Sequence, residues 1–199
     1  MKFLEKLHMV RASRMVFWMV GMLLLLNACQ TAPMTSPVAQ WREIDRLLVL
    51  IDQRLDVATE VAQAKWNSGA AIDDPVRESK ILHDLATTLP DAAQADREFI
   101  LHFFQAQFDA GKIIQRSLHA QWLQQRHPPF SQPPDLSRDI RPELDRLTPM
   151  LIISLRQVRP LLTNASARAY LKQRAEQLVA VNDEPAVRQQ AIGILLTSP

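Results

Sequence analysis

The sequence predicts an all-α protein, a single-domain bundle of six helices that follows an N-terminal signal segment. The composition favours helices, because aromatic residues make up only 6% of the chain and there are only four Gly. Apolar residues recur at steps of three and four in several long segments, and Pro-containing stretches separate those segments. A chain of 199 residues is long enough to bury one core.

The first 28 residues are interpreted as a targeting segment. Basic residues precede an uninterrupted apolar run, 16–26, which has signal-peptide length and is shorter than a membrane span of about 20 residues. The run ends in LNAC, which resembles a lipoprotein lipobox and makes Cys29 a lipidation candidate, with ordinary cleavage nearby as the alternative. We expect export to the periplasm, a tether over 29–38, and contact with the membrane only through the signal peptide or a lipid anchor.

Charge and cysteine usage exclude several kinds of site. The net charge is +2, but residues 1–28 hold four Lys or Arg and one Glu, so the rest of the chain carries −1. A nucleic-acid partner is disfavoured, because no large positive field remains. Cys29 is the only cysteine and the His residues show no metal-ligand spacing, so we expect no internal disulfide and no metal site.

Start and stop signals divide residues 37–126 into three core helices. Ser36 is a candidate N-cap, and Pro37 is then the first residue of the helix. Gly69 is typical of the residue that follows the C-terminus of a helix, so it should end the first helix. Asp74 caps the second helix, with Pro75 at its first position. The three helices are expected at 37–67, 75–89 and 91–126.

The C-terminal half should add three helices after a Pro-rich connector, 127–134, that cannot be helical. Ser137 or a neighbour caps the first of them, Pro149 should kink it, and Pro160 should end it. Asp183 can cap the last helix. These helices are expected at 137–160, 166–180 and 184–197, within a domain that spans 39–199 and has its core helices at 39–126.

The first helix carries two cations where its pattern calls for apolar side chains. Positions 44, 47, 51, 54, 58, 61 and 65 form one stripe, which contains Arg54 and Lys65. These two residues are eleven positions apart, and a helix turns by about 100° per residue. Their side chains therefore point in nearly the same direction from the helix axis. A buried cation without a counter-charge is costly. Either both side chains reach solvent along the helix surface, or an anion sits in the core.

The third helix also has polar groups on its apolar stripe. Gln107, Gly111 and Gln115 lie at successive i, i+4 positions, and a Gly inside a helix costs about 1 kcal/mol relative to Ala. A small gap flanked by two amides suggests a polar cavity. Convergence of Arg54, Lys65, Arg77 and Arg141 on it would make a site for a small polyanion.

The order of these residues resembles the AroQ-type chorismate mutases. Arg54 precedes Lys65 by eleven residues, Arg77-Glu78 follows twelve later, and Gln115 lies within a long helix. The surrounding segments QRLDVATEVAQAKW and DDPVRESKIL extend the resemblance over 40–122. Export, the Pro-rich connector and the segment PPDLSRDIRPELDRL resemble the secreted, gamma subclass, in which extra helices complete the site within one chain.

The resemblance implies an isomerase that converts chorismate to prephenate in one pericyclic step, without a cofactor or metal. Chorismate is then the small-molecule partner, and a homodimer is expected from the family alone. Arginines would clamp the two carboxylates, Lys65 and Gln115 would donate to the ether oxygen, and an acid would accept the ring hydroxyl. The implied substrate contacts are Arg54, Lys65, Asp74, Arg77, Glu78, Gly111, Gln115 and Arg141, of which Lys65, Gln115 and Arg54 are catalytic.

Alternatives remain open at the level of the sequence. Some relatives have Glu at the position of Gln115, and many have Ser or Thr at that of Gly111. Arg138 and Arg146 lie close to Arg141, so a slip of one residue changes which arginine points inward. A lyase that removes pyruvate from isochorismate would use a similar pocket. A non-enzymatic helical lipoprotein of the envelope is the rival of a different class.

Overall fold

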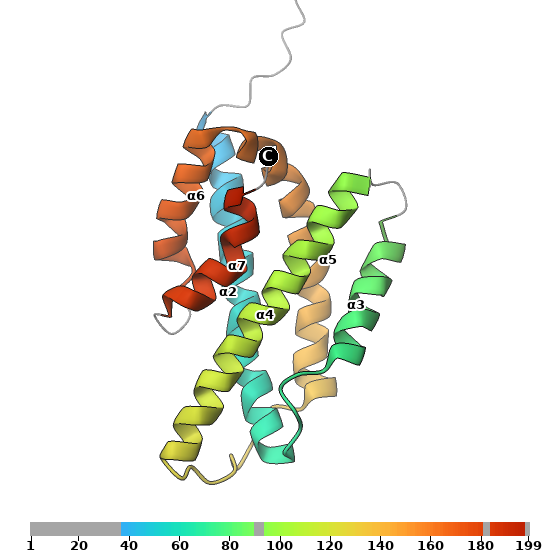
Figure 1. Ribbon diagram of the computed structural model, residues 1–199, viewed down its shortest axis with the longest axis vertical. Helices are drawn as coiled ribbons and strands as arrows, with labels where there is room; N and C mark the ends of the chain where they lie inside the picture. Colours follow the sequence, from blue (N-terminus) through green and yellow to red (C-terminus); the bar gives the residue numbers. More distant parts are fainter. Residues whose placement is uncertain (1–36, 90–93, 181–183, 198–199) are drawn as a thin grey trace, which may run out of the picture. The chain divides into compact units, whose positions relative to one another are not determined.

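The structure is a computed structural model that describes residues 37–89, 94–180 and 184–197. Within these ranges it is all-helical, with six α-helices, and the predicted fold class is confirmed (Figure 1). The helices are α2 (Pro37–Ser68), α3 (Pro75–Thr87), α4 (Gln94–Gln124), α5 (Arg141–Val158), α6 (Ala165–Leu178) and α7 (Pro185–Thr197), with a π-helical turn η1 (Leu136–Ile140) and a 3-10 turn η2 (Arg159–Thr163). None of these helices is both long and apolar enough to cross a membrane. The signal segment, Cys29 and most of the predicted tether lie outside the described residues, but residues 37 and 38 of that tether already belong to α2.

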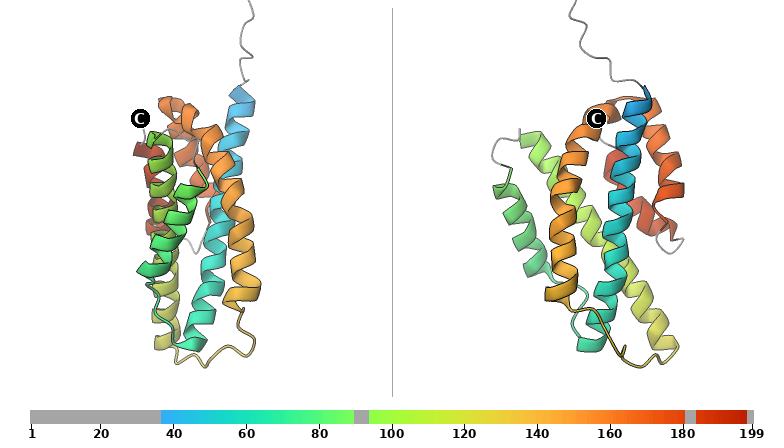
Figure 2. Two further views of the ribbon diagram at one scale, coloured as in Figure 1. Left: turned by 90° about the vertical axis from the view of Figure 1, so that its right-hand side faces the viewer. Right: turned by 180° about the vertical axis from the view of Figure 1, so that it is seen from behind.

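Helix α2 is the central element of the bundle. It packs against α4, α5 and α6, and Figure 2 shows it between α5 and α6 when the molecule is seen from behind. Because three helices surround it, α2 buries residues on more than one face, among them Leu48 and Leu55. On the predicted stripe, Ile44, Leu47 and Ile51 are fully buried. This part of the stripe therefore belongs to the core.

Helix α3 lies at an edge of the bundle, where it packs chiefly against α4 (Figures 1 and 2). Asp74 caps it by accepting a hydrogen bond from the Arg77 backbone N–H at 3.0 Å, and Pro75 is its first residue, as predicted. It ends at Thr87, two residues earlier than expected. Leu85, at 6% exposed, is its one buried residue, and Ile81 and Leu82 are partly buried against the core. Apolar burial therefore holds α3 less firmly than the central helix α2.

Polar and aromatic contacts tie the Pro-rich connector to the ends of α2 and α4. The Asn67 side chain donates to the Phe130 carbonyl and accepts from the Phe130 N–H, both at 2.8 Å. Trp122 packs edge-on against Phe130 and Trp66. Helix α4 ends at Gln124 instead of Arg126, because Arg126 takes a left-handed conformation with φ of 51°.

The start and end of α5 differ from the prediction. Asp135, and not Ser137, caps this region by accepting from the N–H groups of Ser137 and Arg138. The first turn is π-helical, and α5 proper begins at Arg141 and continues through Pro149. Helix α5 ends at Val158, and Pro160 lies inside the 3-10 turn η2 instead of ending the helical path. The predicted cap Asp183 lies outside the described residues.

Candidate active site

A cavity of about 380 Å³ opens between α2, the loop that follows it, α3, α4 and the start of α5. Its volume falls in the range of small-molecule sites. Helix α2 changes role along its length: the last four members of the predicted stripe, which follow Ile51, line the cavity, although Ala58 among them is also part of the core. All eight residues predicted to contact a substrate line it: Arg54, Lys65, Asp74, Arg77, Glu78, Gly111, Gln115 and Arg141.

Arg54 is a largely buried cation, with its Nε fully buried, and it has no counter-ion among the described residues. Its Nε also has no hydrogen-bond partner there. The guanidinium lies over the rings of Phe108 and Phe104, at 5.4 and 5.8 Å from their centroids. Burial lowers the pKa of Arg54 from 12.5 to about 10, so the group stays charged at neutral pH. Aromatic faces offset only part of the cost of burying this charge, which leaves it available to an anion.

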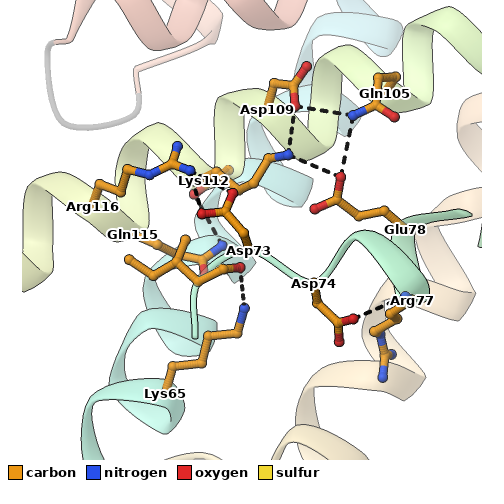
Figure 3. A network of polar contacts seen from close by, with 12 residues as sticks. Lys65, Asp73, Asp74, Arg77, Glu78, Gln105, Asp109, Lys112, Gln115 and Arg116 are labelled. Atoms are coloured by element: carbon orange, nitrogen blue, oxygen red, sulfur yellow. Dashed lines mark hydrogen bonds and ion pairs between the residues drawn. The ribbon is translucent and has the colours of Figure 1, made fainter. Parts of the chain in front are cut away.

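Lys65 is held by the loop between α2 and α3. Its Nζ donates to the Ile72 carbonyl at 2.7 Å (Figure 3). Burial lowers the pKa of Lys65, while the charges of Asp74 and Asp73 act in the opposite direction. An ammonium group carries three donors, so the Ile72 carbonyl leaves donors for a ligand in the cavity.

Alkaline pH should remove activity that depends on these two cations. The lowered pKa values of Lys65 and Arg54 mean that both charges oppose folding at neutral pH, and this penalty is relieved as the pH rises through the lowered values. We expect kcat/KM to fall steeply over the same interval, below pH 10.5, in a pH profile recorded with circular dichroism as the check on folding. Constant activity up to pH 10.5 would contradict this assignment.

The α4 wall carries two amides with unsatisfied oxygens. Gln115 donates from Nε2 to the Gly111 carbonyl at 3.2 Å, and Gln107 donates to the Ala191 carbonyl of α7 at 2.8 Å. The Oε1 atoms of both amides are buried and have no partner among the described residues. An amide NH₂ carries two donors, so Gln115 keeps one for a ligand. Both oxygens belong to residues that line the cavity, so a ligand group there that donates a hydrogen bond could satisfy them.

Gly111 leaves space that is not filled by a neighbour. A Cβ at this position would lie 3.6 Å from the Ala58 Cβ and 4.0 Å from Gln115 Nε2, both ordinary contacts. The Gly111→Ala variant should therefore be more stable than the parent by about 0.5–1 kcal/mol, since Ala loses less conformational entropy in a helix. Urea unfolding measures this difference. A destabilised variant would show that the cavity wall cannot accept a methyl group.

The π-helical turn decides which arginine from the C-terminal half reaches the cavity. The Arg141 N–H donates to the Leu136 carbonyl, five residues back, which gives the turn one more residue than an α-helical turn. Arg141 lines the cavity, whereas Arg138 and Arg146 do not, and Arg146 pairs with Glu143 at 2.6 Å. One extra residue changes the azimuth of all that follow by about 100°, so the turn sets this choice.

Sequence reasoning missed Lys112. This residue lines the cavity and forms ion pairs with Glu78 at 3.0 Å and Asp109 at 2.8 Å (Figure 3). Burial would lower the pKa of Lys112, but hydrogen bonds to Asp109 and Glu78 outweigh it and the pKa is raised. The only sequence signal was a Lys next to Gly111 with an acid three residues earlier, which is typical of an exposed helix pair.

A second polar bridge joins the loop before α3 to α4. Arg116 donates to both carboxylate oxygens of Asp73, at 2.6 and 2.7 Å (Figure 3). The Arg116 hydrogen bond lowers the pKa of Asp73. The loop that holds Lys65 through Ile72 is thereby fastened to α4 from the outside of the cavity.

The charges that line the cavity do not cancel. Five cationic and three acidic side chains leave a formal excess of two positive charges. A small molecule with two negative charges would balance this excess. No group of three His, Cys, Asp or Glu residues with the geometry of a metal site occurs in the part of the chain that the structure describes.

The fold and the cavity define a helical protein with an internal site for a small dianion. The family described as "Chorismate mutase type II" matches residues 39–116. A chorismate mutase structure from Burkholderia thailandensis is 32% identical, with a TM-score of 0.64 over 77% of this chain and 96% of that one. One from Burkholderia phymatum is 25% identical, with a TM-score of 0.67 over 79% and 98%. The chain belongs to the chorismate mutase family, in its all-helical type II form.

Two curated relatives are described as "Secreted chorismate mutase". The protein from Mycolicibacterium smegmatis is 28% identical over 79% of this chain and 87% of its own length. The protein from Mycobacterium tuberculosis is 28% identical over 87% of this chain and 85% of its own length. The family inferred from the sequence is confirmed, and the secreted relatives support export of this chain.

Proposed function

We propose that the cavity is the active site at which this chorismate mutase rearranges chorismate to prephenate. The observation that carries the proposal is the excess of two positive charges around the cavity, which matches the two carboxylates of chorismate. The reaction is a single pericyclic step, in which one carbon–oxygen bond breaks as one carbon–carbon bond forms. It needs a bound, compact conformer of the substrate and stabilisation of the charge that develops on the ether oxygen.

Three arginines on three elements would grip the substrate carboxylates. Arg54 comes from α2, Arg77 from α3 and Arg141 from the start of α5. A guanidinium can bind both oxygens of a carboxylate at once. Because the three arginines approach from different helices, they can hold the two carboxylates in a fixed relation and restrict the flexible side chain of the substrate.

Lys65 and Gln115 would stabilise the ether oxygen. Both have donors left after their contacts with Ile72 and Gly111, and both are fixed by those contacts before substrate arrives. Donors that are already oriented need no reorganisation as charge develops. Glu78, together with the backbone near Asp74, would receive the ring hydroxyl.

Assays of purified residues 30–199 with chorismate and with isochorismate test the proposal. We expect conversion of chorismate to prephenate, followed by the loss of chorismate absorbance, and little release of pyruvate from isochorismate. Pyruvate as the main product would assign the lyase reaction to this cavity. Absence of turnover with both substrates would favour a non-enzymatic envelope protein and refute the proposal.

We infer further that export places the domain in the periplasm and that Cys29 carries the lipid anchor. The lipobox-like sequence supports this inference. Radiolabelled palmitate should enter the full-length protein and not the Cys29→Ser variant. Labelling of neither protein would favour ordinary cleavage.

A homodimer is the assembly expected from the family, and light scattering of residues 30–199 tests it.

A further inference from the structure

Lys112 lies between two carboxylates at the rim of the cavity (Figure 3). Its Nζ is 3.0 Å from Glu78 Oε2 and 2.8 Å from Asp109 Oδ1, and its side chain is only 15% exposed. Gln105 completes the group, with Nε2 at 3.1 Å from Asp109 Oδ1 and 3.4 Å from Glu78 Oε2. Three of these residues come from α4, whereas Glu78 comes from α3.

The contacts within this cluster constrain one oxygen of Glu78. Lys112 and Gln105 both donate to Oε2, and neither contacts Oε1. Glu78 lines the cavity, so its second oxygen is the one available to a ligand there. A carboxylate held by one oxygen presents the other in a defined direction.

The position of Glu78 depends in part on these contacts, because α3 lies at the edge of the bundle (Figures 1 and 2). Leu85 is its one buried residue, Ile81 and Leu82 are partly buried against the core, and the Asp73–Arg116 ion pair fastens the loop before it. The contacts from α4 to Glu78 therefore help to set the distance between the first turn of α3 and α4. Without Lys112, Glu78 would also present an uncompensated negative charge to a dianionic ligand.

We propose that Lys112 is a positioning residue, which holds Glu78 Oε2 so that Oε1 accepts the ring hydroxyl of the substrate. The inference rests on the proposed function, because it takes chorismate as the ligand of the cavity. Lys112 acts through Glu78 and not on the substrate, since its ammonium group is already directed at two carboxylates. It thereby sets substrate affinity at a point that no arginine clamp reaches.

The test is a double-mutant cycle on the active protein, residues 30–199, with Lys112→Met, Glu78→Gln and the double variant. We expect Lys112→Met to lower kcat/KM about 10- to 100-fold, which corresponds to the loss of one hydrogen bond to a charged group. The loss should lie mainly in KM, because the hydroxyl contact exists in the bound substrate as well as in the transition state. When Glu78 is already replaced by Gln, adding Lys112→Met should lower kcat/KM little further. Lys112→Arg, which keeps the donor and the charge, should recover most of the loss.

Lys80→Gln is the matched control, because it breaks an exposed ion pair on the same α3, with Asp84 at 2.7 Å, and should leave kcat/KM unchanged. If Lys112→Met folds poorly, Gln105→Met removes the other donor to Glu78 Oε2 without a change of charge and should raise KM less, in the same direction. Unchanged activity of both Lys112→Met and Gln105→Met overturns the inference. Full additivity in the cycle also overturns it, because Lys112 would then act on the substrate directly. A parent protein inactive on chorismate would refute the proposed function instead.

Discussion

Replacing Arg54 with Met is expected to remove most of the activity and to make the protein more stable. Burial lowers the pKa of Arg54 from 12.5 to about 10, which corresponds to a free-energy penalty of about 3 kcal/mol for the charged side chain in the folded protein. Met keeps the apolar stem that packs near Phe104 and Phe108 and removes the charge. We expect kcat/KM to fall about 10²- to 10³-fold, and the free energy of unfolding to rise by about 1–3 kcal/mol.

Steady-state kinetics and urea unfolding measure the two effects on the same preparation. Arg77→Met is the matched control, because Arg77 lines the same cavity but is exposed. It should lose activity without a gain in stability, since little burial cost is relieved. An Arg54→Met variant that is less stable than the parent would mean that the guanidinium has a partner in the free protein. A variant that stays fully active would remove Arg54 from the mechanism.

Replacing Gln115 with Glu is expected to make activity depend on acid. Gln115 is 7% exposed and its amide already contacts the Gly111 carbonyl. A carboxylate there has no proton to donate to the ether oxygen, whereas the protonated acid has one. Burial raises the pKa of a carboxyl group above about 4.3, so the variant should gain activity as the pH falls through that raised value.

The pH profile of kcat/KM between about pH 4 and pH 9 tests this expectation. The parent protein should show no acid-dependent gain over this range, because an amide does not titrate. Gln115→Leu should be impaired at every pH, since it has no donor in any state. If Gln115→Glu and Gln115→Leu have parallel profiles, the residue acts through packing and not as a donor.

The site gains its ligand affinity at the expense of stability. Arg54 Nε, Gln107 Oε1 and Gln115 Oε1 are buried without partners among the described residues, and all three residues line the cavity. A buried polar atom that finds no partner costs about 1–3 kcal/mol. A ligand carboxylate can accept a hydrogen bond from Arg54 Nε and so recover part of that cost, which ties binding to stability, whereas the two amide oxygens need a hydrogen-bond donor. Thermal unfolding should therefore respond to a non-reactive dicarboxylate analogue of the substrate.

The sequence determined the helices and the cationic stripe of the site. Asp74 before Pro75 and Gly69 after the first helix are local signals, because caps and left-handed positions depend only on neighbouring residues. Arg54 and Lys65 stood out because helical periodicity placed them on the same stripe as Ile44 and Ile51. That periodicity is a property of the chain alone, so the segment could be identified as both scaffold and candidate site without coordinates.

Only the tertiary structure decided how the remaining groups meet. Arg141 could not be separated from Arg138 and Arg146, because the π-helical turn that rotates it toward the cavity depends on packing around Leu136 and Ile140. Lys112 carried no distinct signal, because its partner Glu78 lies 34 residues away on another helix. Periodicity gives the face of one helix but not the distance between two. The distance between two helices is set by packing in the bundle. Charged residues on different helices form one site only when that packing brings them close together.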